Sequence, residues 1–132
     1  MLEELKVEGK VENNVIILSV EFNQEFLMSR QAGEQLSSEL TRRYREIRQE
    51  RTWGVKTSFC IVEIKSQVAG SSLVRALFEL WREVVGREGG QVICVNYPAE
   101  YIDSLTSLGL PALEGFTLAE TIGDAMARIN KM

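Results

Sequence analysis

The sequence predicts an α/β fold in which a mixed sheet of four to five β-strands packs with about four α-helices. Three observations support this prediction. Short apolar runs typical of strands recur along the chain, stretches with helical periodicity separate them, and glycines or turn residues stand between many of these segments. In the second half strands and helices alternate, which indicates parallel strands joined by right-handed crossovers.

The first segment is predicted to be a β-hairpin. In residues 5–11, Leu5, Val7 and Val11 alternate with polar residues, as in a strand with one face in water. Residues 15–22, VIILSVEF, are more continuously apolar, and VENN between the two runs supplies turn residues.

A long helix is predicted from Ser29 onward, because the period of the apolar residues changes there. They recur at spacings of three or four: Met28, Ala32, Leu36, Leu40, Tyr44 and Ile47. RTWGVKT, residues 51–57, breaks this pattern with a glycine. SFCIVEI, residues 58–64, then has the composition of a buried strand.

A second helix is predicted at about Ser71 to Arg87, after a short connection at residues 65–70. It carries two adjacent apolar rows, Leu73, Leu77, Leu80 and Val84 on one and Val74, Phe78, Trp81 and Val85 on the other. So wide an apolar face predicts a helix pressed against a sheet, or against a sheet and a partner. Gly89 or Gly90 is suited to end it in a left-handed conformation.

One more buried strand and two helices complete the predicted fold. QVICV, residues 91–95, is the strand, and residues 96–109 form a helix with Pro98 near its first turn and Gly109 beyond its last. The final helix is predicted within GFTLAETIGDAMARI, residues 115–129, where Thr117 and Glu120 have the spacing of a capping box. Its apolar stripe consists of Leu118, Ile122, Met126 and Ile129. Whether residues 114–116 form a short strand before this helix is left undecided by the sequence.

The composition favours one domain over residues 1–132, since 45% of the residues are hydrophobic and no segment has the composition of a linker.

The net charge of −4 disfavours nucleic acid and anionic membranes as partners. We interpret the arginines of residues 41–51 as a solvated helix face: Arg42, Arg43, Arg45, Arg48 and Arg51. Without a leader or a long apolar run, a cytoplasmic protein is expected.

Catalytic and metal chemistry is disfavoured by the residue types present. The chain has no histidine, which removes Ser/His/Asp and Cys/His catalysis and the common zinc sites. Cys60 and Cys94 lie inside strand-like runs without CxxC spacing, so we interpret them as buried apolar residues of a reducing compartment. We therefore expect no metal, no cofactor and no enzymatic activity.

Three segments of the second half follow one another in a distinctive order: GSSLVRALFELWREVVGREGGQVICV, PAEYIDSLTSLGL and FTLAETIGDAMARI. Together they resemble the STAS family, the small domains of anti-sigma-factor antagonists and of related bacterial regulators. The likeness extends from the first hairpin to the last helix and is clearest from Ser58 onward. It implies a STAS-type fold and a non-catalytic protein that binds an anti-sigma factor, which is also a serine kinase.

In that family an acidic residue ends a strand, and a loop then leads to an Asp-Ser-Ser-Gly type motif. By resemblance, Glu63 takes the acidic position, Ser71 the phosphoacceptor position and Ser72 the position of the second serine. Gly70 stands where the family has its aspartate and Leu73 where it has its glycine. Counting forward from Glu63 instead places Ser72 at the acceptor position. The resemblance implies that phosphate on this serine breaks the complex with the anti-sigma factor.

The predicted partner surface combines the VAGSS loop with the exposed side of the second helix: Val68, Gly70, Ser71, Ser72, Val74, Arg75 and Phe78. Alternatives stay open. Ser71 can be a plain helix N-cap worth about 1 kcal/mol. The chain can be an unphosphorylated scaffold that assembles with other STAS proteins or with copies of itself, or a nucleotide-binding module. A phosphoacceptor receiver domain is set aside, because LSVEFNQEF has no adjacent acidic pair and EIKSQ has no aspartate.

Overall fold

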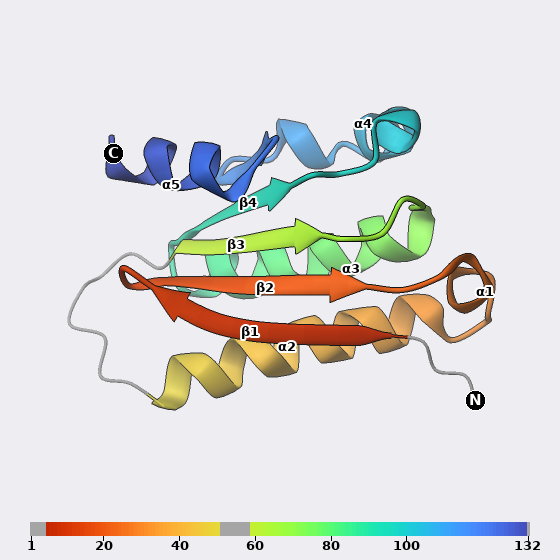
Figure 1. Cartoon of the computed structure of the whole chain (residues 1–132), viewed down its shortest axis with the longest axis horizontal. Coiled ribbons are helices and arrows are strands. Elements are labelled where there is room, and N and C mark those ends of the chain that lie inside the picture. Colours follow the sequence, from red (N-terminus) through yellow and green to blue (C-terminus); the bar gives the residue numbers. More distant parts are fainter. Residues whose placement is uncertain (1–4, 51–58, 132) are drawn as a thin grey trace.

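A five-stranded mixed sheet runs through the computed structural model, which describes residues 5–50 and 59–131 (Figure 1). Its strands lie side by side in chain order: β1 (Lys6–Glu12), β2 (Val15–Glu21), β3 (Phe59–Ile64), β4 (Gln91–Val95) and β5 (Phe116–Ala119). β1 is antiparallel to β2, and all later pairs are parallel. The predicted α/β class, the mixed sheet and the parallel second half are confirmed.

The predicted hairpin is confirmed, and its turn explains why asparagines stand there. β1 and β2 are paired up to Glu12 and Val15, so that Asn13 and Asn14 alone form the turn. Both have a positive φ, 54° and 66°. A two-residue turn of this mirror-image type matches the twist of the strands, and asparagine tolerates its left-handed backbone better than most residues.

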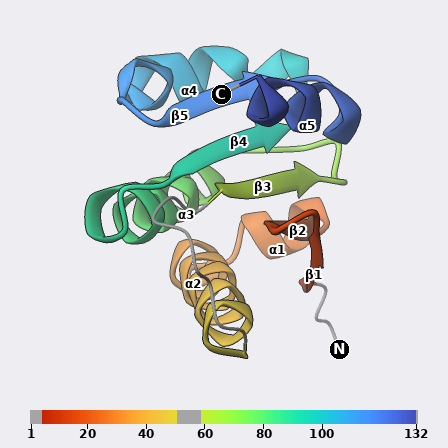
Figure 2. The same cartoon turned by 90° about the vertical axis from the view of Figure 1, so that its left-hand side faces the viewer.

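Helices cover both faces of the sheet (Figure 2). α2 (Ala32–Glu50) and α3 (Ser71–Trp81) pack on one face, and a π-helical turn at Arg82–Arg87 extends α3. α5 (Ile122–Asn130) packs on the other face. The main core lies under α2 and α3 and includes the first predicted row of the second helix, all completely buried: Leu73, Leu77, Leu80 and Val84.

The long helix starts later than its apolar stripe predicts. A separate turn, α1 (Gln24–Leu27), precedes it, and the side chain of Asn23 caps α1 by accepting a hydrogen bond from the Phe26 amide. α2 begins only at Ala32, so Met28 lies outside it and is 78% exposed. The prediction that Met28 belongs to the buried stripe was wrong, because the chain reverses between the two helices. The predicted break at residues 51–57 lies outside the described residues.

The last strand and helix correct a second prediction. Residues 116–119 pair in parallel with β4, with Phe116 opposite Val92 and Ala119 opposite Val95. α5 begins after Thr121, whose hydroxyl accepts a hydrogen bond from the Asp124 amide at 3.0 Å. The predicted capping box of Thr117 and Glu120 is therefore wrong, because pairing with β4 satisfies the backbone that a helix there would use. For the same reason Leu118 belongs to the strand.

Glycines end two helical segments as predicted. Gly89, with φ of 69°, ends the extension of α3, and the Gly90 amide donates to the Val84 carbonyl at 2.9 Å. α4 (Ile102–Ser107) follows a 3₁₀ turn at Ala99–Tyr101, and Gly109 with φ of 82° lies just beyond it. Another 3₁₀ turn, Leu110–Ala112, leads toward β5. Within the described ranges, no helix is long and apolar enough to cross a bilayer.

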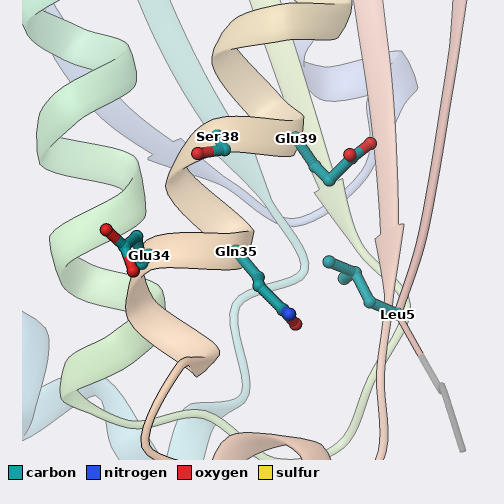
Figure 3. A pocket seen from close by; sticks show the side chains of 5 residues that line it. All are labelled: Leu5, Glu34, Gln35, Ser38 and Glu39. Atoms are coloured by element: carbon teal, nitrogen blue, oxygen red, sulfur yellow. The ribbon is translucent and has the colours of Figure 1, made fainter.

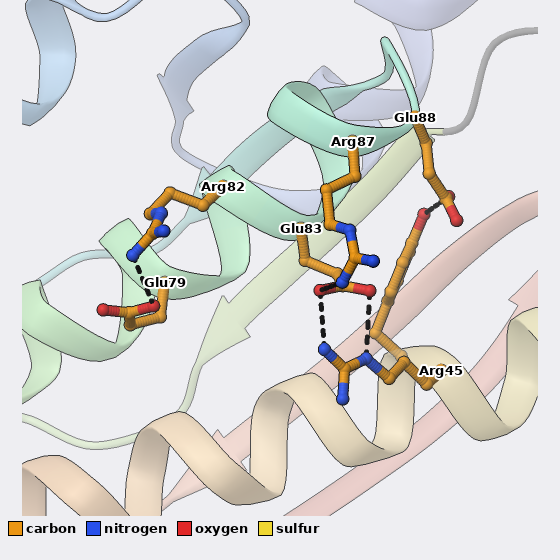
Figure 4. Close-up of polar contacts among 7 residues, drawn as sticks. Arg45, Glu79, Arg82, Glu83, Arg87 and Glu88 are labelled. Atoms are coloured by element: carbon orange, nitrogen blue, oxygen red, sulfur yellow. Dashed lines mark hydrogen bonds and ion pairs between the residues drawn. The ribbon is translucent and has the colours of Figure 1, made fainter.

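Ion pairs hold α2 against the extension of α3 (Figure 4). The Arg45 guanidinium makes two hydrogen bonds to the Glu83 carboxylate, at 2.9 and 3.0 Å, and Arg87 approaches the same carboxylate at 3.5 Å. Arg48 donates to Glu88 at 2.8 Å. Arg42 pairs with Glu39 and Glu46 on its own helix. Much of the positive charge in residues 41–50 is thus neutralised within the chain.

We predict that the contribution of Glu83 to stability depends on pH. Its hydrogen bonds from Arg45 hold the pKa of the Glu83 carboxyl below its ordinary value. A lowered folded-state pKa stabilises the fold above the unfolded pKa of about 4.3, and this stabilisation is lost as the pH falls through the folded-state pKa. Glu83→Gln should lower the free energy of unfolding by about 1 kcal/mol at neutral pH. This difference should shrink at about pH 3.

Chemical denaturation at both pH values measures this difference. Glu79→Gln is the matched control, because Glu79 makes a single, longer contact to Arg82 at 3.4 Å and is more exposed. A Glu83→Gln difference that stays the same at both pH values would contradict the prediction.

We predict that Gly115→Ala is more destabilising than Gly109→Ala. Both glycines have a positive φ, 87° and 82°. A Cβ on Gly115 would lie 2.8 Å from Cγ1 of Val85, whereas a Cβ on Gly109 would meet nothing within 4 Å. Gly109→Ala should therefore cost about 1 kcal/mol for the backbone alone, and Gly115→Ala about 1 to 3 kcal/mol more. In a Val85→Ala background, where the clashing methyl groups are gone, the two costs should converge in thermal or chemical unfolding.

Candidate functional site

The loop between β3 and α3 is tied to the end of β2 by a buried serine. The Ser66 hydroxyl accepts a hydrogen bond from the Phe22 amide at 2.7 Å and donates one to the Phe22 carbonyl at 2.8 Å. The Lys65 amide also donates to the Val20 carbonyl. Sequence reasoning missed Ser66, because a single serine in a loop belongs to no periodic pattern. Its effect is to fix where α3 begins, at the carboxyl edge of the sheet.

Ser71 and Ser72 are the first two residues of α3, and neither is its N-cap. Gly70 holds the N-cap position, and no side chain makes a capping hydrogen bond there. The Gly70 carbonyl accepts the Leu73 and Val74 amides. Ser71 is exposed and Ser72 is half-buried. The interpretation of Ser71 as an N-cap is therefore wrong, and its hydroxyl is accessible for another role.

Both serines line a groove of about 500 Å³ between the start of α2, α3 and the segment that follows α4. Its described lining consists of Arg30, Gly33, Ser71, Ser72, Val74, Arg75, Phe78, Leu108 and Leu110. α2 and α3 lie close together here, since a Cβ added at Gly33 would be in ordinary van der Waals contact, 3.4 Å from Cδ of Arg75 and 3.7 Å from Cα of Ser72. The groove thus depends on how closely α2 packs on α3.

The predicted partner residues contribute unequally to this groove. Val68 and Gly70 are not part of its lining, and Val68 packs against the main core. Val74 is only 3% exposed, so it offers little surface to a partner. Phe78 is 38% exposed and stacks on Trp81, whose indole N–H donates to the Glu114 carbonyl at 2.8 Å. This contact holds the Phe78 ring in place at the groove.

Glu63 lies on the opposite side of the sheet from α3. Its neighbours Val62 and Ile64 point into the main core, so strand alternation turns Glu63 toward the face that α5 covers. There its carboxylate accepts a hydrogen bond from the Ser19 hydroxyl at 3.0 Å. Glu63 is consequently not among the described residues that line the groove beside Ser71.

Two other hollows differ from this groove in charge. One, of about 440 Å³ between β1 and α2, is lined by Leu5, Glu34, Gln35, Ser38 and Glu39 (Figure 3). The other, of about 750 Å³ beyond the ends of β4 and β5, includes the carboxylates of Glu120 and Asp124 and the guanidinium of Arg128. The carboxylates in both hollows disfavour phosphate groups. The described residues contain no cluster of three or more His, Cys, Asp or Glu that could hold a metal ion.

The two cysteines are completely buried free thiols in neighbouring strands. Burial raises the pKa of the Cys94 thiol to about 12, and it raises the pKa of Cys60 further. Both thiols therefore stay protonated and unreactive in the folded protein. Their interpretation as buried apolar residues is confirmed.

A mixed five-stranded sheet with this arrangement of helices defines a domain of the STAS fold. Among solved structures, the chain is similar to a serine-to-glutamate variant of RsbS from Moorella thermoacetica, a STAS-domain protein. The two share 18% sequence identity over 96% of this chain and 99% of that chain, with a TM-score of 0.64. No protein-family model and no curated protein matches this sequence. The STAS-type fold predicted from the motifs is confirmed.

We predict that Ser66 and Ser71 differ sharply in their effect on stability. Ser66→Ala leaves the buried Phe22 amide and carbonyl without a partner and should cost about 2 kcal/mol in the free energy of unfolding. Ser71→Ala removes an exposed hydroxyl without a capping bond and should change stability by less than about 0.5 kcal/mol. Chemical denaturation of both variants measures this. A Ser71→Ala cost as large as that of Ser66→Ala would restore the capping role.

Proposed function

We propose that this chain is a non-catalytic regulatory protein that acts as an anti-sigma-factor antagonist. In this proposal it binds an anti-sigma factor, which is also a serine kinase, through the face at the start of α3. Ser71 is the proposed phosphoacceptor, and Ser72 is the alternative. The observation that carries the proposal is the position of the two serines, which open α3, line a groove and have no capping role within a STAS fold.

Phosphorylation of Ser71 is compatible with the fold and would change the proposed interface. In α3 the Gly70 carbonyl accepts the Leu73 and Val74 amides, whereas the first amides of a helix, here those of Ser71 and Ser72, have no acceptor within it. Together with the helix dipole these amides favour an anion there. A phosphate adds about −1.5 to −2 charges. At the edge of an interface this charge must be desolvated or paired, and a partner shaped for the neutral serine does neither. Phosphate would therefore release the partner.

Gly70 stands in the place of the family's aspartate, and the structure leaves room for that residue. Gly70 has an extended backbone, and a Cβ there would meet nothing within 4 Å. The absence of the aspartate thus removes a carboxylate from the acceptor site without changing the backbone. If the kinase uses this carboxylate, Gly70→Asp should increase phosphorylation of the chain.

A scaffold role is the second candidate, and Gly70 and Leu73 favour it because they depart from the acceptor motif. In that role the serines stay unmodified, and the chain assembles with other STAS proteins or with copies of itself. Under either role we propose that residues 1–132 act as one domain in the bacterial cytoplasm.

Affinity capture of the full chain from its native cells tests the proposal. Mass spectrometry should identify a kinase-like anti-sigma factor among the captured proteins and partial phosphorylation of the peptide that contains Ser71 and Ser72. Capture of other STAS proteins with serines that are never modified would instead support the scaffold.

We predict that Ser71→Asp weakens binding of the captured kinase-like partner roughly tenfold, while Ser71→Ala does not. Ser38→Asp is the matched control, because it adds the same charge on α2 outside the groove and at an exposed site (Figure 3). Calorimetric titration of the three variants measures the affinities. Equal weakening by Ser38→Asp and Ser71→Asp would show an effect of net charge alone and would contradict the proposed site.

A further inference from the structure

Two arginines line the groove beside Ser71. Arg30 and Arg75 are the only charged residues in its described lining. Within the described ranges neither guanidinium makes an ion pair or a side-chain hydrogen bond. Of the other described arginines, five are paired with glutamates: Arg42, Arg45, Arg48, Arg82 and Arg87. Arg128 donates to the Leu118 carbonyl, and Nε of the partly buried Arg43 has no hydrogen-bond partner. The groove therefore carries positive charge that the chain does not neutralise.

Apolar side chains line the same groove as these two arginines. Three large apolar side chains in the described part of the chain are well exposed, and two of them, Phe78 and Leu108, line this groove. Leu108 is 60% exposed and ends α4 just before the left-handed turn at Gly109. Val74 and Leu110, both buried, lie beneath. Exposed apolar residues gathered at a hollow mark an interaction site.

We propose that this groove binds a partner segment that combines an apolar side chain with carboxylates. The apolar side chain would insert between Phe78 and Leu108, and the carboxylates would pair with Arg30 and Arg75. Charge complementarity favours such a segment, since the groove is locally positive on a chain with a net charge of −4. This inference rests on the proposed function and names the chemistry by which the anti-sigma partner is recognised.

The same arginines connect the groove to the proposed phosphorylation. Ser71 and Arg75 are four residues apart on α3, so their side chains lie on the same face of the helix. A phosphate on Ser71 would be within reach of the Arg75 guanidinium, with which it forms strong charge-assisted hydrogen bonds. Arg75 would then be unavailable to a carboxylate of the partner. Phosphate would act as a competitor within the chain, without any need for an aspartate at residue 70.

Fluorescence anisotropy with defined peptides tests the inference on the full-length protein. The probe is a short fluorescein-labelled peptide with one central leucine flanked by glutamates. One control peptide has lysines in place of the glutamates, and another has serine in place of the leucine. The glutamate–leucine peptide should bind roughly tenfold more tightly than either control, and added salt should weaken its binding.

Charge reversal in the groove should change the preference for these peptides. Arg75→Glu or Arg30→Glu should weaken binding of the acidic peptide roughly tenfold, and the double variant should prefer the lysine peptide. Arg82→Glu is the matched control, because it changes the net charge equally on an exposed side chain outside the groove. Phe78→Ser should weaken binding, whereas Met28→Ser, also at an exposed residue, should not. Circular dichroism verifies that each variant is folded.

Two results would overturn the inference: equal affinity for the acidic and lysine peptides, or equal weakening by Arg82→Glu and Arg75→Glu. The same variants separate this inference from the proposed function. If the captured anti-sigma partner binds Arg30→Glu and Arg75→Glu as tightly as the unaltered chain, the inference fails and the proposed function stands. If the acidic peptide binds as described but no kinase-like partner is captured, the groove chemistry stands and the proposed function fails.

Discussion

The close packing of α2 against α3 on one face of the sheet is the interaction on which the candidate site depends. The helices lie close together at the start of α2, where a Cβ on Gly33 would contact Arg75, and the two hydrogen bonds from Arg45 to Glu83 hold them together further along. Between these points Leu36, Leu40, Leu73 and Leu77 are completely buried. Because both helices are fixed, Arg30 from the segment before α2 and Arg75 from α3 line one groove. Neither helix alone forms it.

The start of α3 combines a rigid position with chemically free groups. Ser66 is buried and bonded twice to Phe22, so it fixes the loop that leads into the helix. Ser71, five residues later, has no structural bond of this kind. This arrangement suits the proposed regulatory site, because a modified or recognised residue must be accessible while its support stays in place. It also explains why two serines so near in the chain have different consequences when they are substituted.

Patterns between neighbours in the chain were sufficient for most of the fold. Alternation and apolar runs predicted the strands β1 to β4, a pair of asparagines predicted the first turn, and Gly89 and Gly109 predicted the ends of helices. The errors occurred where strand pairing or a chain reversal overrode local signals. Residues 117–120 have the spacing of a capping box, but residues 116–119 pair with β4. Met28 continues an apolar stripe but lies before the start of α2.

In the candidate site, too, local patterns predicted adjacent residues, and only the tertiary structure showed the contacts between distant ones. The residues of the motif, Ser71 and Ser72 at the start of a helix after a buried strand, were recognisable in the sequence because they are adjacent. The sequence did not show that Glu63 is turned toward α5 or that Gly70, not Ser71, is the N-cap of α3. It also did not show that Arg30 and Leu108 line the groove. Arginines 42, 45 and 48 appeared in the sequence as a basic cluster, yet glutamates neutralise them. Which charges are paired depends on distances between residues far apart in the chain, and only packing of the helices on the sheet sets those distances.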